Sequence, residues 1–413
     1  MSQKSNSKIK YSLLDNFFVN SRFTLLASLT IIPIILSIGI IPSISFVDAL
    51  QEKDSETQCR EGQVLVFRTI ANNFVCVSEA TAERWVELGL AEIVSDVAEE
   101  ESMEESMEES MEDIKISSSI LEYTQESPTI DPEKGYFVTE IADGLYWLSD
   151  GGYQVMFLTT GEGVIVVDAP PSLGERYLDA VAEVTDEPIT HVIYSHIHKD
   201  HIGAASQFPA DATIIAHEDT ASHLVMKNDP NRPVPTVTFD EMYTLSVGDQ
   251  TLELSYDGAF HSKGDIMIFA PKQNVLMVVD HFLPGGAPFK AFALTTDMNN
   301  YIAAYDLILE KNPALIISGH TEILATTDHV KTSKEYTLDV LENASTAFQT
   351  VDFNQIAEEN GALGLVGIFD AYIDTLARTC SDLTLEQWDG RLPSVEVFME
   401  DNCTAMVFHV FID

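Results

Sequence analysis

The most distinctive chemistry in this chain lies in residues 195–203, which run SHIHKDHIG. This segment holds His196, His198, Asp200 and His201 within six positions, directly after an expected strand. Imidazole and carboxylate groups are typical zinc ligands. One histidine alone is usually structural, but four ligand-type residues at this spacing favour a metal site. His196 and His198 can face one metal ion, while Asp200 and His201 turn toward a second.

With these residues the sequence resembles the metallo-β-lactamase-fold superfamily, whose pattern H-x-H-x-D-H is followed by a histidine, a bridging carboxylate and a final histidine. Three later motifs supply these positions in order: GAFHSKGD with His261, VLMVVDHF with Asp280 and IISGHTE with His320. The resemblance implies a first zinc on His196, His198 and His261. It implies a second zinc on Asp200, His201 and His320, with Asp280 bridging the two. Iron and manganese are alternative metals.

Two further carboxylates are expected to support the ligands from behind. Asp168, in GVIVVDAP, matches the acidic residue that follows an early strand in the family and supports the ligand loop. Asp265 can brace His261 in the same way, or be a turn residue facing solvent. His281, next to Asp280, would point to the opposite side of an extended segment, so it is not included among the ligands.

The resemblance implies a hydrolase. Two zinc ions would hold a bridging hydroxide at neutral pH, because a bound metal lowers the pKa of water from about 15.7 to near 7. This hydroxide would attack a carboxylic ester, lactone or thioester, and Asp200 could pass a proton to the leaving group. Dedicated β-lactamases of the family carry Cys or Ser where this chain has Asp280. Three alternatives stay open: a phosphodiester or sulfate-ester hydrolase, an iron-dependent sulfur dioxygenase, and a non-catalytic surface binding protein.

The elements that position these residues form an α/β pattern with mixed sheets. Hairpins are expected over residues 136–148 and 155–167, turning at Asp143-Gly144 and at residues 161–163. Further strands are expected at 191–195, 213–216, 252–256, 267–270, 275–279 and 315–318. Helices are expected at 173–184, 220–227 and 299–310. The resemblance implies that residues 135–343 form an αββα sandwich, with residues 344–413 as a C-terminal extension packed on it.

The N-terminal region resembles an export signal. Residues 1–22 carry Lys4, Lys8, Lys10 and Arg22, and residues 23–47 form a long uncharged apolar run. A positive flank before such a run predicts export, with residues 23–47 acting as a cleaved signal peptide or as a retained membrane anchor. The remaining chain is then expected to be extracellular or on the cell surface.

Two short segments precede the expected catalytic domain. Residues 58–94 predict a small module with a hairpin and an amphipathic stretch over 79–93, which a bridge between Cys59 and Cys76 would stabilise. Residues 95–134 contain SMEE repeats and are interpreted as an acidic, solvated linker. Near the C-terminus, Cys380 and Cys403 form a second local pair. Outside the cytosol both pairs are candidates for disulfides, although spacing alone does not fix their connectivity.

The overall charge limits the partners. The chain has 22 basic and 66 acidic residues, a formal net charge of −44. A field this negative repels phosphate backbones, so nucleic acid is not an expected partner. The expected partner is a small-molecule substrate, and the membrane is a partner only if residues 23–47 are retained. The sequence does not indicate an oligomeric state.

Overall fold

The computed structural model describes residues 63–68, 73–78, 91–93 and 116–412. The chain divides into two compact units, residues 1–105 and 106–413. The predicted export segment 23–47, Cys59 and the acidic residues 95–115 lie outside the described residues. Within the part of the chain that is described, no helix is long and apolar enough to cross a membrane.

The first unit contains a three-stranded antiparallel sheet in the order β2-β1-β3. Its strands are β1 Gln63–Arg68, β2 Asn73–Ser78 and β3 Ala91–Ile93. The hairpin predicted here is present, since Val64 pairs with Val77 and Val66 pairs with Val75. β3 pairs with β1 at the end of the stretch predicted to be amphipathic. Cys76 lies in β2, and its predicted bridge to Cys59 stays a prediction.

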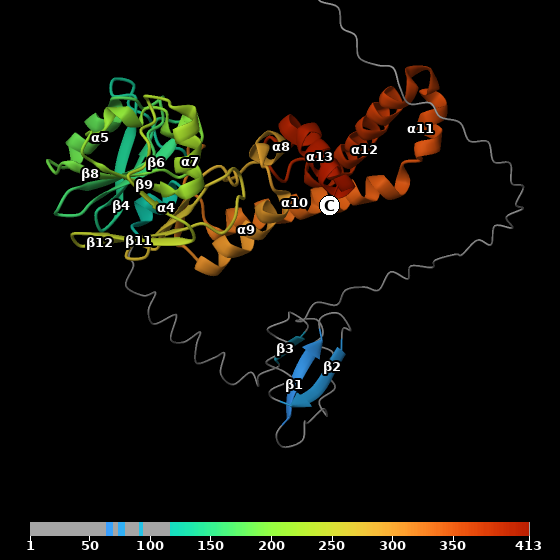
Figure 1. The fold of residues 1–413 in the computed structure, drawn as a ribbon, viewed down its shortest axis with the longest axis horizontal. Helices are drawn as coiled ribbons and strands as arrows, with labels where there is room; N and C mark the ends of the chain where they lie inside the picture. The colour runs from blue at the N-terminus through green and yellow to red at the C-terminus, as the bar shows by residue number, and fades with distance from the viewer. Residues whose placement is uncertain (1–62, 69–72, 79–90, 94–115, 413) are drawn as a thin grey trace, which may run out of the picture. The chain divides into compact units, whose positions relative to one another are not determined.

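The second unit confirms the α/β class with two mixed sheets (Figure 1). The seven-stranded sheet has the order β10-β9-β8-β7-β6-β5-β4. Its strands are β4 Phe137–Ala142, β5 Leu145–Ser149, β6 Gln154–Thr159, β7 Val164–Val167, β8 Ile189–Ile193, β9 Thr213–His217 and β10 Val237–Phe239. The five-stranded sheet runs in order through β11 Met242–Val247, β12 Gln250–Ser255, β13 Met267–Ala270, β14 Val275–Val278 and β15 Leu315–Ile317.

The five-stranded sheet is buried on both faces, as alternation along β14 shows. Val275 and Met277 belong to the apolar cluster that includes the seven-stranded sheet. Leu276 and Val278 belong to a second cluster, which includes helix α9 Met298–Lys311 through Tyr301 and other residues. Successive side chains of a strand point to opposite faces, so a run without polar residues serves two layers at once. The apolar run before Asp280 therefore places this residue at the end of a central, rigid strand.

Shorter helices connect the strands of the seven-stranded sheet. These are α5 Arg176–Val184, α6 Lys199–Ile202, the 3₁₀ turn η1 Ala205–Gln207 and α7 Glu218–Lys227. α5 packs on the sheet through buried Tyr177, whose hydroxyl donates to the carbonyl oxygens of Met156 and Val167. This bonding satisfies the polar end of a side chain that is otherwise in the core.

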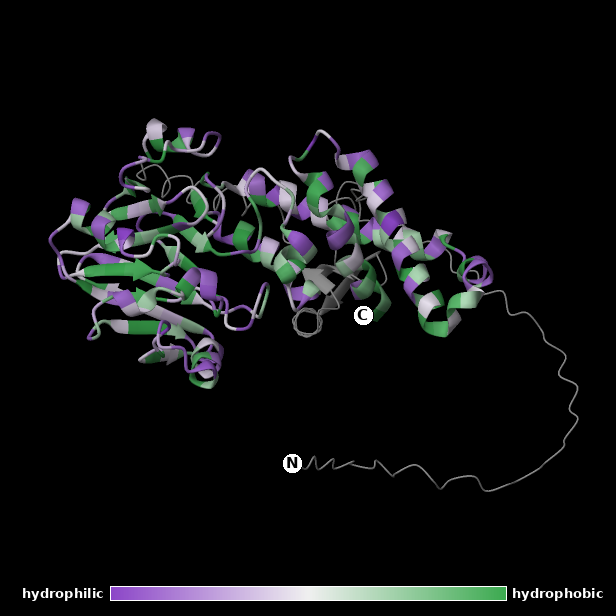
Figure 2. Cartoon of the chain, turned by 90° about the horizontal axis from the view of Figure 1, so that it is seen from above, coloured by the Kyte–Doolittle hydropathy of each residue, from purple (hydrophilic) through white to green (hydrophobic). Residues whose placement is uncertain are grey.

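A helical layer follows the sheets. It consists of α10 Thr327–Thr350, α11 Phe353–Glu359, the 3₁₀ turn η2 Gly361–Leu363, α12 Gly364–Trp388 and α13 Val395–Ile412. Figure 2 shows hydrophobic stretches along the strands and mixed hydrophobic and hydrophilic stripes along these helices. α13 also packs on α8 Lys290–Leu294, a short turn beyond β14. A disulfide between Cys380 and Cys403 joins α12 to α13.

Two predicted boundaries need correction. The limit of the catalytic domain at residue 343 falls inside α10, because Asn343 is a buried residue of that uninterrupted helix. The predicted linker 95–134 includes α4 Ser118–Glu122, in which Ile120 is buried in the main apolar cluster. Tyr123, directly after α4, packs edge-on against Phe137 of β4. The polar composition around α4 concealed these few apolar contacts.

Candidate metal centre

The candidate ligands lie at the carboxyl ends of strands from both sheets. His196 follows β8, which is parallel to β7, and His320 follows β15, which is parallel to β14. Asp280 follows β14, and His261 lies in the loop between β12 and β13. The carboxyl ends of parallel strands meet at one sheet edge, where side chains from distant segments converge. The sandwich brings two such edges together.

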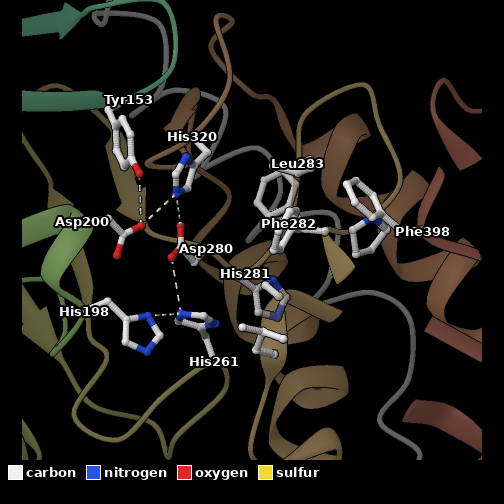
Figure 3. A pocket seen from close by; sticks show the side chains of 14 residues that line it. Tyr153, His198, Asp200, His261, Asp280, His281, Phe282, Leu283, His320 and Phe398 are labelled. Carbon is white, nitrogen blue, oxygen red and sulfur yellow. Dashed lines mark hydrogen bonds and ion pairs between the residues drawn. The ribbon is translucent and has the colours of Figure 1, made fainter. Parts of the chain in front are cut away.

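The seven predicted ligands form two groups that share one residue. In each group the ligand atoms lie within 4.8 Å of one another. The first group is His196, His198, His261 and Asp280, and the second is Asp200, His201, His320 and Asp280. Figure 3 shows Asp280 between the two sides of this arrangement. The structure thus brings together every residue proposed as a ligand, with the predicted division into two sets.

The carboxylate of Asp280 is the centre of the cluster. Its Oδ2 atom lies 3.1 Å from His201 Nε2, 3.3 Å from His261 Nε2 and 3.6 Å from His196 Nε2. Its Oδ1 atom lies 3.3 Å from His320 Nε2. One carboxylate facing four imidazoles, with an oxygen toward each ligand group, is suited to bridging two cations.

Several atoms of the cluster also need a partner that protein groups do not supply. His196 Nε2 and Asp280 Oδ1 are buried and make no hydrogen bond within the described residues. Ring nitrogens also converge in pairs, with His261 Nε2 3.0 Å from His198 Nδ1 and His201 Nε2 3.1 Å from His320 Nε2. Buried polar atoms without partners are costly. Cations between these nitrogens and oxygens would satisfy them, so the donor set fits a two-metal centre.

Asp168 supports the ligands without lying among them. Its Oδ1 accepts from the Ser195 backbone N–H at 2.8 Å, and its Oδ2 accepts from the Ser195 hydroxyl at 2.7 Å. Ser195 Oγ in turn lies 2.9 Å from His196 Nδ1. Because the hydroxyl proton goes to Asp168, Ser195 Oγ accepts from His196 Nδ1, which leaves His196 Nε2 free to bind a metal. Burial raises the pKa of Asp168 to about 6.

Asp265 braces His261 through the backbone rather than through the ring. Its Oδ2 accepts the N–H groups of Phe260 at 3.1 Å and His261 at 2.9 Å, and its Oδ1 accepts that of Ser262 at 3.1 Å. Three donors on one buried carboxylate fix the loop that carries His261. The interpretation of Asp265 as a solvent-facing turn residue is wrong, since it is 2% exposed.

The backbone adopts left-handed conformations at strand ends that carry the ligands or the supporting carboxylate of Asp168. Asp168 has φ 58° and Asp280 has φ 62°, values uncommon for residues other than glycine. Gly319, just before His320, has φ 85°, and a Cβ atom there would lie 2.5 Å from Val279 Cγ1. Strain of this kind concentrates at functional sites. Here it turns each strand end sharply toward the cluster.

The protonation of the cluster suits metal binding. Burial keeps the pKa of His196 well below its ordinary value and lowers that of His198 to about 4, so both are neutral at pH 7. Neutral imidazole is the form that binds metal. Burial lowers the pKa of His201, but the Asp280 carboxylate outweighs this effect and raises the pKa to about 9. A cation binding beside His201 must therefore displace a proton.

Sequence reasoning did not identify Tyr153, which lies at the same centre. Its hydroxyl donates to Asp200 Oδ2 at 3.2 Å, and its ring centroid lies 4.4 Å from that of His320. Tyr153 pairs with His320 in an isolated bridge between distant segments. No local motif marks Tyr153, because only the folded chain brings these segments together. Burial and the neighbouring Asp200 raise its pKa to about 12.

His281 has a structural role, in line with its omission from the ligands. It is buried, and its Nε2 donates to the carbonyl oxygen of Tyr301 at 2.8 Å. Its ring stacks on that of Tyr301 with a centroid distance of 4.6 Å. The strand end that carries Asp280 is thereby tied to α9.

Residues 149–320 match the model of the metallo-beta-lactamase superfamily. This match confirms the resemblance to that superfamily for this part of the chain. The 2,4-dinitroanisole O-demethylase subunit alpha of Nocardioides sp. (strain JS1661) is 29% identical over 165 residues, 37% of this chain and 50% of that protein. The chain thus matches about half the length of this relative.

Other similar proteins are metallo-beta-lactamases. The type 2 enzyme of Elizabethkingia meningoseptica is 22% identical over 231 residues, which cover 53% of this chain and 88% of that enzyme. Among solved structures, a metallo-beta-lactamase from Pontibacter korlensis has a TM-score of 0.43 and 18% identity, covering 48% of this chain and 97% of that chain.

Proposed function

We propose that this protein is an exported dinuclear zinc hydrolase that cleaves a carboxylic ester, lactone or thioester. The observation that carries this proposal is the pair of ligand groups sharing Asp280 at one end of a pocket of about 760 Å³. A pocket of this size suits a small-molecule substrate. The match of residues 149–320 to the metallo-beta-lactamase superfamily supports metal-dependent hydrolysis.

His196, His198 and His261 would hold one cation, and Asp200, His201 and His320 the other, with Asp280 shared. When bound, two such cations would lower the pKa of water and polarise the carbonyl group of a substrate. The protein's own contribution is to aim neutral imidazoles at the site and to hold Asp168 and Asp265 behind them. The donors are thus preorganised before the substrate arrives.

Asp200 and Tyr153 are placed to manage the proton. Burial raises the pKa of Asp200, but His320 and His201 outweigh this effect and lower the pKa to about 2. Asp200 is therefore ionised at neutral pH. Its Oδ2 atom can accept a proton and pass it to the leaving group. Tyr153 stays protonated and donates to the same oxygen at 3.2 Å, which fixes the orientation of the carboxylate.

The lining of the pocket supports a carboxylic ester over a phosphodiester or sulfate ester. It includes the metal-ligand side chains and apolar residues, and among these described lining residues there is no Lys or Arg. A phosphate or sulfate has oxygens beyond those that two metals bind, and cationic side chains usually hold them. A carboxylic ester has no such additional charge.

The first experiment measures metal content and hydrolysis in the same purified protein. We expect about two zinc ions per chain and chelator-sensitive cleavage of one class in a panel of lactones, thioesters, carboxylic esters, β-lactams, phosphodiesters and 2,4-dinitroanisole. His196→Ala should abolish turnover, while His223→Ala, a histidine of α7 outside the cluster, should not. One iron with oxygen-dependent turnover would indicate a sulfur dioxygenase. A folded protein that takes up no metal would indicate a binding protein.

Export is proposed from the sequence. The apolar residues 23–47 follow a basic flank and suit a signal peptide or an anchor. Protease treatment of intact cells should digest the full-length protein if it lies on the cell surface. A protein that stays protected until lysis would contradict export.

A further inference from the structure

The pocket beside the metal centre has a second, apolar half. One end is formed by the ligand side chains, and the other by Phe282, Leu283, Phe289, Leu294 and Phe398. Figure 3 shows the ligands on one side and Phe282, Leu283 and Phe398 on the other. Two of these large apolar residues are well exposed, with Phe289 at 46% and Leu294 at 59%. A ligand that covers apolar side chains in a pocket removes their surface from water, which makes the free energy of binding more favourable.

The apolar wall is built partly by the C-terminal helix. Phe398 is a residue of α13, far beyond residues 149–320, which match the superfamily. Its ring packs edge-on against Phe289, with centroids 4.9 Å apart. Phe289 directly precedes α8, so this contact joins the loop after Asp280 to the helical layer. The far end of the pocket thus combines residues of the matched region with Phe398, which the C-terminal extension contributes.

Asn402 of α13 holds the loop that carries the wall. It is fully buried, its Oδ1 accepts from the Phe292 N–H at 3.0 Å, and its Nδ2 donates to the Pro288 carbonyl at 3.1 Å. One bond holds the backbone just before α8 and the other holds it within α8, where Ala291 to Leu294 have φ between 51° and 61°. A run of left-handed residues without glycine needs such support from outside.

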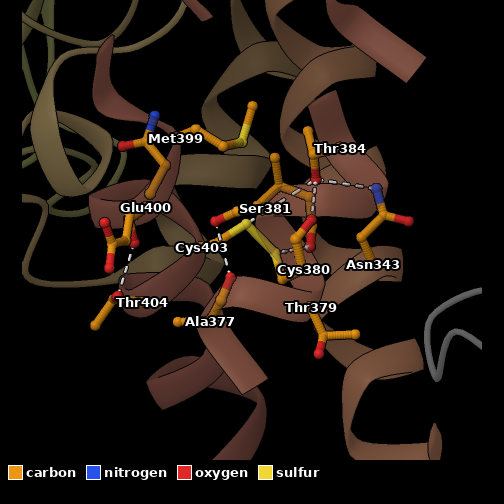
Figure 4. Close-up of a disulfide and its surroundings, with 12 residues drawn as sticks. Asn343, Ala377, Thr379, Cys380, Ser381, Thr384, Met399, Glu400, Cys403 and Thr404 are labelled. Atoms are coloured by element: carbon orange, nitrogen blue, oxygen red, sulfur yellow. Dashed lines mark hydrogen bonds between the residues drawn. A yellow bond between two sulfur atoms is a disulfide. The ribbon is translucent and has the colours of Figure 1, made fainter. Parts of the chain in front are cut away.

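The disulfide fixes the helix that bears both residues. Cys403 follows Asn402 and is bonded to Cys380 of α12. Figure 4 shows this bond between the two helices, close to Thr384 and Asn343. Asn343 of α10 donates to Thr384 Oγ1 at 3.0 Å, so a third helix is joined to the pair. α13 is therefore a rigid support for one side of the pocket.

We propose that this apolar wall binds the hydrocarbon chain of an uncharged substrate, with Phe398 as a specificity-determining residue and Asn402 as a positioning residue. The proposal rests on the hydrolase function proposed above. The described lining residues offer no cation for an anionic group away from the metals, and the net charge of −44 disfavours polyanions. The substrate class is then a neutral ester, lactone or thioester with a medium-length acyl chain.

The test uses the zinc-loaded full-length protein and p-nitrophenyl esters from acetate to decanoate. We expect kcat/KM to rise by about fourfold per added methylene group that the wall buries. Phe398→Ala should lower kcat/KM for decanoate by about tenfold or more and leave acetate nearly unchanged. Phe408→Ala is the matched control, because Phe408 lies on the same helix, is 41% exposed and does not line the pocket.

A test of the positioning role of Asn402 needs a measurement that a loss of protein stability alone does not change. Asn402→Ala should flatten the dependence of kcat/KM on chain length. Asn343→Ala removes a comparable buried amide between α10 and α12, and it should lower Tm without changing that dependence. If both variants alter chain-length selectivity equally, Asn402 has only a structural role.

Binding of undecan-2-one, a neutral ketone without a hydrolysable bond, separates this proposal from the proposed function. Calorimetry on metal-free protein should detect binding that Phe398→Ala weakens. Ketone binding without ester hydrolysis would support the binding role of the apolar wall and refute the proposed hydrolase function. Ester hydrolysis that is independent of chain length, or a failure of the ketone to bind, would overturn the proposal that the apolar wall binds a hydrocarbon chain.

Discussion

Asp265 offers a sharp test of how the metal centre is held. The Asp265→Asn substitution keeps the shape of the side chain and replaces one acceptor oxygen by an NH₂ group. The amide oxygen can still accept from Phe260 and His261, but the NH₂ group then faces the N–H of Ser262. One bond is lost, and two lose the benefit of a charged acceptor. At about 1.5–3 kcal/mol for each charge-assisted bond, we expect a loss of about 3 kcal/mol in the free energy of unfolding.

The same substitution should affect the two metals unequally. Asp265 holds the backbone of His261, which belongs only to the three-histidine group. Loss of a supporting residue typically lowers metal affinity by about 10- to 100-fold. The other group depends on Asp200, His201 and His320, whose segments do not contact Asp265 through any of these bonds. One zinc should therefore weaken while the other is retained.

Two measurements check this expectation. Denaturant unfolding of the metal-free protein gives the stability effect alone, and zinc titration against a competing chelator gives the two affinities. Asp257→Asn is the matched control, since Asp257 is an exposed carboxylate in the same loop. The reasoning is refuted if Asp265→Asn binds both zinc ions with unchanged affinity, or if both affinities fall equally.

Tyr153→Phe removes the hydroxyl that donates to Asp200, and it should lower kcat by about 10- to 100-fold while zinc content stays the same. An unchanged kcat would show that the hydroxyl is dispensable. His329 caps α10 by accepting from a backbone N–H, and burial lowers its pKa, so the unfolded chain takes up the proton first as pH falls. The wild type should lose stability below about pH 6.5 relative to His329→Gln, and a pH-independent difference in unfolding free energy would contradict this. Replacing Cys380 and Cys403 together by Ala should lower the unfolding free energy by about 3 kcal/mol, with zinc content unchanged. Reduction of the wild type should produce the same loss, and equal stability of the oxidised and reduced wild type would refute it.

The ligand set was accessible from the sequence because each ligand lies in a short motif in a segment that follows a strand. His196, His198, Asp200 and His201 lie within six positions of the chain, and Asp280 and His320 each follow a continuous apolar run. Such runs mark strands that are buried on both faces. The motifs and their order in the chain thus predict most of the arrangement of ligands in the site.

Other elements have weaker patterns in the sequence. β10 and β11 were not predicted, since β11 at the edge of its sheet has mostly exposed alternate residues and no apolar run. α10 crosses the predicted boundary at residue 343 because nothing in its sequence marks the end of the catalytic part. Tyr153 reaches Asp200 only through the packing of strands that are distant in sequence.

The difference between the two halves of the pocket follows from the forces involved. Metal binding is directional and needs particular donor atoms, so the ligands form a pattern that a sequence displays. Apolar binding depends on buried area and not on direction, so Phe398 and Phe289 could be replaced by many side chains of similar size. The superfamily match ends at residue 320, whereas Phe398 and Asn402 lie in α13. We therefore expect the reaction type to follow from the matched region and the choice of substrate to follow from the helical extension.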